Sequence, residues 1–115
     1  MSRSDMQGCI EECEKCHDAC LRAVAHGLRE SGHYVEAAHI IVLLDCVDMC
    51  ATSVNFLLRE SARHRRTCEL CAEMCDACAK SCAAFRDDGE MRGCEAECQR
   101  CAEACREMAR RTEPA

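Results

Sequence analysis

Apolar and thiol side chains recur every three or four residues along most of the chain, and charged residues fill the positions between them. This spacing is close to the 3.6-residue period of an amphipathic helix with one buried face. We predict helices over residues 5–29, 34–60, 64–86 and 90–111. Four helices of similar length with short connections predict an all-α fold, an antiparallel up-and-down four-helix bundle formed by residues 1–115 as a single domain.

Turn-forming residues separate the predicted helices. Ser31 and Gly32 interrupt the first periodic segment, and the basic stretch 63–66 lies between the second and the third. Asp88 stands just before Gly89, and an aspartate at this position is a typical N-cap, because its carboxylate accepts hydrogen bonds from the first free amides of a helix. The fourth helix is therefore expected to begin directly after this turn.

Cysteine, at 15 of 115 positions, sets the register of the helices. Within each predicted helix the cysteines are three or four residues apart, which places them on the face that points into a bundle. The second helix contributes only two of them. The sequence therefore predicts a cysteine-lined core made of Cys9, Cys13, Cys16, Cys20, Cys46, Cys50, Cys68, Cys71, Cys75, Cys78, Cys82, Cys94, Cys98, Cys101 and Cys105.

Antiparallel packing predicts that these positions stack in flat layers about 5 Å apart, because the helical rise is about 1.5 Å per residue. Each layer would take one residue from each helix. Counting from the turns, the expected layers are Cys9, Ser53, Cys71 and Cys105; Cys13, Cys50, Cys75 and Cys101; Cys16, Cys46, Cys78 and Cys98; and Cys20, Val42 or Leu43, Cys82 and Cys94.

Composition and charge exclude several classes of partner. The formal net charge is −6 and aromatic residues make up 3% of the chain, which argues against nucleic acid as a partner. The longest aliphatic run, residues 40–44, is too short to span a membrane. The first residues lack the apolar stretch of a secretory signal, so we expect a cytoplasmic protein whose thiols stay reduced. The odd number of cysteines also prevents complete intrachain pairing.

The thiols are therefore expected to bind metal, and charge favours Cu(I). A tetrathiolate zinc site keeps two negative charges, and several such sites in one dry core would repel one another strongly. Cu(I) needs two or three soft sulfur ligands, and exchanging one proton for one Cu(I) at each cysteine leaves the core neutral, at about one ion per thiol. Two alternatives stay open, an iron–sulfur electron-transfer protein and a zinc or heavy-metal buffer of the metallothionein type. No catalytic constellation is apparent, so we do not expect an enzyme.

Three segments resemble the bacterial four-helix-bundle copper storage proteins, in particular their cytosolic branch. They are residues 44–50, the cysteine block from Cys68 to Cys82, and the closing series from Cys94 to Cys105. The resemblance spans the whole chain and implies Cu(I) storage by core thiolates in a homo-oligomer, usually a tetramer. It also implies that copper enters at one end of each bundle past histidine and methionine. The corresponding candidates for metal entry are His39 and Met91.

The second helix carries a further apolar stripe beside its two cysteines. This stripe is rotated by one residue from the cysteine seam, and a single bundle needs only one apolar face per helix. We therefore predict that the second helix forms a contact between copies of the chain. The stripe consists of Ile40, Leu44, Val47, Ala51, Val54 and Leu58.

Overall fold

The computed structural model describes residues 3–111, and these form four long helices. The helices are α1 (Arg3–Glu30), α2 (Ala37–Leu58), α3 (His64–Cys82) and α4 (Gly89–Arg111). Two short 3-10 helices, η1 (Gly32–Val35) and η2 (Ala83–Phe85), lie in the connections. The described chain has no strand, which confirms the predicted all-α fold.

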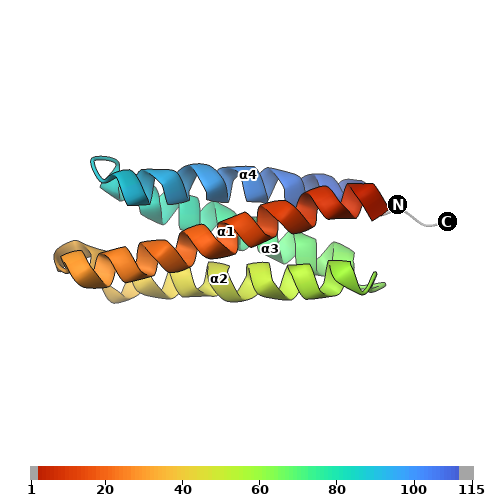
Figure 1. The fold of residues 1–115 in the computed structure, drawn as a ribbon, viewed down its shortest axis with the longest axis horizontal. Coiled ribbons are helices and arrows are strands. Elements are labelled where there is room, and N and C mark those ends of the chain that lie inside the picture. Colours follow the sequence, from red (N-terminus) through yellow and green to blue (C-terminus); the bar gives the residue numbers. More distant parts are fainter. Residues whose placement is uncertain (1–2, 112–115) are drawn as a thin grey trace.

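The helices run antiparallel, as predicted. Each packs against two neighbours, so that α1 contacts α2 and α4 while α3 contacts the same two helices from the opposite side (Figure 1). The bundle is elongated, with principal extents of 50 × 19 × 18 Å. One end holds the α1–α2 and α3–α4 connections, and the other holds the α2–α3 connection and both termini (Figure 1).

The connections set the helix ends and correct some predicted bounds. Ser31 and Gly32 both adopt positive φ, 56° and 71°, which stops α1 where the sequence indicated. The expected start of the second helix at residue 34 is wrong, because residues 32–35 form η1 and α2 begins at Ala37. The expected end of the third helix at residue 86 is also wrong, because the backbone tightens into η2 after Cys82.

The predicted N-cap of the fourth helix is present. The Asp88 carboxylate accepts a 3.0 Å hydrogen bond from the backbone amide of Met91, and α4 begins at the next residue, Gly89. This interaction satisfies one of the amides that the first turn of a helix leaves without a partner.

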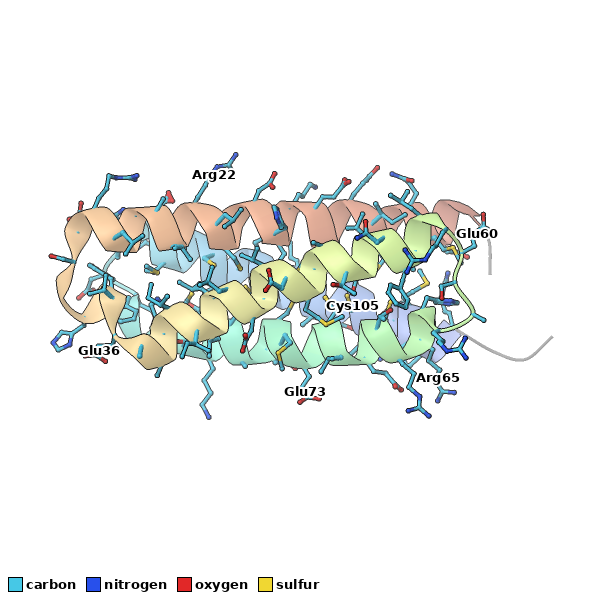
Figure 2. All side chains as sticks on the ribbon, turned by 90° about the horizontal axis from the view of Figure 1, so that it is seen from below. Arg22, Glu36, Glu60, Arg65, Glu73 and Cys105 are labelled. Atoms are coloured by element: carbon cyan, nitrogen blue, oxygen red, sulfur yellow. The ribbon has the colours of Figure 1, made fainter. Side chains whose placement is uncertain are left out.

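Charged side chains cover the outside of the bundle. Figure 2 shows Arg22, Arg65 and Glu73 projecting from the helices and Glu36 and Glu60 projecting from the connections, whereas Cys105 lies between the helices. Helix α2 differs from the others, because among the described helices it alone has the length and apolarity of a membrane-crossing segment. This finding differs from the expectation based on the short aliphatic run.

The excess apolarity of α2 lies partly on its outer face. Ile41, Leu44 and Leu58 are exposed there, with Leu58 at 60%. Val47, which the sequence placed on the outer stripe, is buried within its own bundle. The exposed stripe is therefore narrower than predicted.

Candidate metal centre

All fifteen cysteines are buried and none forms a disulfide. Thirteen of the fifteen thiols have no accessible surface. The other two, Cys9 and Cys94, are 3% and 2% exposed. This follows from the three-and-four spacing, which keeps each thiol on the inner face of its helix. The predicted cysteine-lined core is confirmed.

The thiols form a continuous series of five groups. In each group, four Sγ atoms lie within 4.8 Å of one another. Successive groups share two thiols, so the series has no gap along the bundle axis. In order, the groups are Cys13, Cys71, Cys101 and Cys105; Cys50, Cys71, Cys75 and Cys101; Cys16, Cys46, Cys50 and Cys75; Cys16, Cys20, Cys46 and Cys98; and Cys20, Cys78, Cys94 and Cys98.

The predicted flat layers are wrong in the position of α3. Cys75 lies 3.8 Å from Cys16 and 3.7 Å from Cys46, although the sequence placed it one layer away from them. Likewise, Cys78 lies 3.7 Å from Cys20.

None of the five groups takes one thiol from each helix. Cys75 contacts both α2 thiols, and Cys98 contacts both Cys16 and Cys20. The thiols therefore stand between layers, and successive groups share members.

Three cysteines extend the series beyond the five groups. Cys9 lies 3.8 Å from Cys105 at the end that holds the termini, and Cys68 interacts electrostatically with Cys9 and Cys105. At the other end Cys82 interacts with Cys94. The structure thus brings together all fifteen predicted site cysteines in one column.

Contacts between the thiols shift their acidities in opposite directions. A hydrogen bond with Cys16, followed by those with other neighbours, lowers the pKa of Cys46. The interaction with Cys16 raises the pKa of Cys98, and burial raises it further. Some cysteines are therefore stabilised as thiolates, while neighbouring cysteines stay protonated and donate hydrogen bonds to them. Such a core takes up a cation most readily in exchange for a proton, because the buried charge then stays constant.

The two candidate entry residues lie at the end that holds η1 and η2. His39 is 4% exposed, its Nδ1 is 2.6 Å from the Ser81 hydroxyl, and its ring packs 4.8 Å from that of Phe85. Its Nε2 is buried and has no hydrogen-bond partner in the described chain. Burial lowers the pKa of His39, which favours the neutral imidazole. Met91 is fully buried at the same end.

Sequence reasoning missed a polar cluster that closes this end. The Asp88 carboxylate lies 2.8 Å from Nε2 of His26 and accepts a 3.2 Å hydrogen bond from the Tyr34 hydroxyl. The Tyr34 ring also packs against Phe85, 5.0 Å between centroids. These residues are far apart in sequence and off the cysteine seam, so helical periodicity carries no signal of their contact.

A buried acidic pair between α1 and α4 was also missed. Oε1 of Glu12 and Oε2 of Glu97 are both buried without a hydrogen-bond partner in the described chain. Burial, followed by interaction with Glu12, raises the pKa of Glu97. A 2.7 Å ion pair between Arg100 and Glu97 offsets part of the free-energy cost of burying the Glu97 carboxylate.

Comparison with known proteins identifies relatives with the same fold. The family model described as "copper storage protein" matches residues 2–110. The Nmul_A1745 protein of Nitrosospira multiformis is 42% identical, with a TM-score of 0.87 over 95% of this chain and 98% of its own. The Cu(I)-bound copper storage protein 3 of Bacillus subtilis, BsCsp3, is 33% identical, with a TM-score of 0.85 over 91% and 98%.

A third relative is described as cytosolic. It is a copper storage protein from Streptomyces lividans, solved during copper loading with five coppers. It is 30% identical, with a TM-score of 0.88 over 96% of this chain and 97% of its own. The match to the family model spans nearly the whole chain, and the buried thiol column agrees with it. The chain belongs to the copper storage protein family.

Proposed function

We propose that this protein stores Cu(I) in the cytoplasm, binding about one ion per cysteine through thiolates of the core, without a catalytic step. The observation that carries the proposal is the unbroken series of five thiol groups, each sharing two members with the next. Shared thiols suit Cu(I), because thiolates bridge soft ions and each ion needs only two or three of them. Family membership supports the same function.

The spacing of the sulfur atoms fits direct metal coordination. Neighbouring Sγ atoms lie between 3.7 Å, as for Cys16 and Cys46, and 4.0 Å, as for Cys50 and Cys75. Three sulfurs that each bind one ion at about 2.3 Å stand about 4 Å apart. The thiols are therefore spaced for bare ions, and contacts this close leave no space between them for the sulfide ions of an iron–sulfur cluster.

Charge supports Cu(I) over zinc. Among the described residues, no lysine or arginine side chain is buried, so the core holds no cation that would offset the negative charge of zinc tetrathiolates. Three of the five groups have no thiol in common and could each form a separate zinc tetrathiolate. Three such sites with two uncompensated charges each would be strongly penalised in a low dielectric. Replacing protons by Cu(I) avoids this cost.

An anaerobic titration tests the storage function. Fully reduced protein is titrated with Cu(I) against a chromophoric Cu(I) chelator, and the expected result is saturation near the 15 cysteines of the chain. Cys46→Ser with Cys50→Ser should lower the capacity, because these two residues belong to three of the five groups. Saturation of the unaltered protein at only a few ions contradicts the proposal and favours discrete zinc or iron–sulfur sites.

Metal entry is assigned to His39 and Met91. His39 supports this role because its Nδ1 is 2.6 Å from the Ser81 hydroxyl while its Nε2 has no partner in the described chain. In the tautomer that donates Nδ1–H to Ser81, the Nε2 lone pair is available to a metal ion. Cys94, in the last thiol group, is near enough for its charge to affect the pKa of His39. Met91 adds a thioether, a soft ligand of the kind that Cu(I) prefers.

The proposal also includes an oligomer, in which copies of the chain contact one another through α2. Ile41, Leu44 and Leu58 expose apolar surface on one helix, and the same helix carries Asp45 and Asp48, which would be costly to bury in lipid. A second copy of the chain covers the apolar residues and leaves the aspartates in water at the rim. This favours an oligomer over membrane insertion.

Light scattering tests this contact. Leu44→Glu should produce monomers, whereas Leu21→Glu, at a similarly exposed position on α1, should leave the oligomer intact. An unaltered oligomer in the Leu44 variant would contradict the assignment to α2. Binding of the unaltered protein to lipid vesicles would instead favour the membrane.

A further inference from the structure

A groove between α1 and α4 leads from the surface to a core thiol. Its volume is about 360 Å³, and Cys94 lies among its lining residues. Cys94 donates a hydrogen bond to Cys20 over 3.7 Å and belongs to the last of the five thiol groups. The groove thus reaches the thiol column from the side of the bundle.

Small residues make room for this approach. Ala19 of α1 and Gly93 of α4 both line the groove. A Cβ atom at Gly93 would meet no other atom within 4 Å, so the space beside this residue is open. A glycine inside a helix weakens it, and here it leaves the passage to Cys94 unobstructed.

The rim and wall of the groove carry charges that are available to a ligand. Lys15 and Arg22 have no ion-pair partner in the described part of the chain, and Arg22 extends outward from α1 (Figure 2). Arg100 is engaged by Glu97. The rest of the Glu97 carboxylate, which is only 7% exposed, interacts with Glu12, so Glu97 is not available to a ligand.

The groove lining also includes two carboxylates, Asp18, which lies 3.0 Å from His17, and Glu90. It therefore offers both positive and negative side chains to a zwitterionic ligand.

We propose that this groove binds a small zwitterionic thiol carrying carboxylates, which delivers Cu(I) to Cys94 and removes it again. The inference rests on the proposed storage function. Lys15 and Arg22 bind the carboxylates, and the Glu90 carboxylate on the groove lining attracts the ammonium of the ligand. Its thiol then lies over Cys94.

Transfer is a ligand exchange without a redox change. The sulfur of Cys94 forms a bond to Cu(I), the bond between Cu(I) and the carrier's sulfur breaks, and the proton of Cys94 passes to the departing carrier thiolate. Copper stays Cu(I) throughout, and the buried charge is unchanged. The reverse exchange unloads the last thiol group.

Transfer rates from a glutathione–Cu(I) complex test the proposal. Gly93→Leu fills the groove and should slow transfer to the reduced protein at least tenfold. Gly8→Leu is the matched control, since Gly8 is also helical and a Cβ there also meets nothing within 4 Å; its rate should equal that of the unaltered protein. Equal rates for the two variants would overturn the groove as the docking site.

Charge reversal provides a second and independent variant. Lys15→Glu with Arg22→Glu should slow transfer from glutathione several-fold but leave transfer from the uncharged carrier 2-mercaptoethanol unchanged. Equal slowing with both carriers, or none with either, would contradict binding through the carboxylates. Final copper capacity is measured for every variant by chelator competition, so that a failure of storage in the unaltered protein is distinguished from a failure of the groove.

Discussion

The two ends of the thiol column are closed by different chemistry. At the end with the termini, Met6, Ile10 and Leu57 line a common pocket and are almost completely buried. At the other end the covering residues include a neutral histidine with an unpartnered nitrogen, His39, and the buried thioether of Met91.

The end with the termini, the aliphatic end, also has a buried histidine, His64, but its Nδ1 lies 2.8 Å from the Ser61 carbonyl. At the opposite end, the polar end, Nε2 of His39 has no partner in the described chain. From this difference we expect the aliphatic end to maintain the fold and the polar end to admit metal.

The largest effect on stability is expected at the aliphatic end. Leu57 is 1% exposed, and Leu57→Ala should lower the free energy of unfolding by about 3 kcal/mol, because it removes buried methyl groups and leaves a cavity. Chemical denaturation of the reduced, metal-free protein measures this change. Leu58→Ala, next to it but exposed, should change stability by less than about 0.5 kcal/mol.

The rate of copper uptake should not respond to Leu57→Ala in protein that remains folded. A slower rate would show that the aliphatic end also admits metal, and the functional contrast between the ends would be lost.

The largest effect on the rate of copper uptake is expected at the polar end, where His39 and Met91 lie. His39→Ala should slow uptake of Cu(I) supplied as its acetonitrile complex about tenfold, equivalent to about 1.4 kcal/mol in the barrier, and leave the capacity unchanged. Stopped-flow absorbance of the forming Cu(I)–thiolate bonds measures the rate. His64→Ala is the matched control, because His64 is a buried histidine at the aliphatic end. Equal slowing by both variants would show that His39 has no special role.

A smaller effect is expected from the cluster that closes the polar end. Asp88→Ala removes the N-cap of α4 and the contacts with His26 and Tyr34, and it should lower the free energy of unfolding by about 1 kcal/mol. Asp88→Asn keeps an N-cap and should cost less. Thermal denaturation of the two variants at neutral pH measures this difference, and equal losses would show that the cap contributes little.

The contribution of Asp88 should also depend on pH. Burial opposes its ionisation, but hydrogen bonds from the Met91 amide and from His26 outweigh this and hold the pKa below 3.8. The unfolded chain therefore binds this proton first as the pH falls. The stabilisation is complete above about pH 4 and is lost as the pH falls through the lowered pKa. The Asn variant should lack this part of the acid dependence.

The helices and the buried thiols could be predicted because both depend on local spacing. Every interval between cysteines within a helix is three or four residues, so a single period places each one on the inner face. The stagger of α3 could not be predicted in this way. It depends on where the α2–α3 connection ends, and there Glu60 adopts a positive φ of 52° and the Ser61 amide bonds back to the Phe56 carbonyl. Counting residues from a presumed turn misses such details.

The residues at the polar end were only partly predictable. His39 follows the cysteine seam in phase, so periodicity identifies it as an inward residue. The partners that enclose it, Ser81 and Phe85, come from a different helix and from a connection whose 3-10 geometry has no clear sequence signal. The acidic pair of Glu12 and Glu97 was missed for a related reason, since glutamates beside a cysteine seam are normally solvated.

The pairwise sharing of thiols has a consequence for the history of the stored ions. An ion held by one group already touches two ligands of the next, so it can move along the column by exchanging one bond at a time. Both proposed routes, past His39 and through the groove at Cys94, lead to the last thiol group. The first ions to arrive should then be displaced toward Cys9 and Cys68, and later arrivals should fill in behind them. If access is from this end alone, we expect the bundle to behave as a last-in, first-out stack, in which the position of each ion records when it entered.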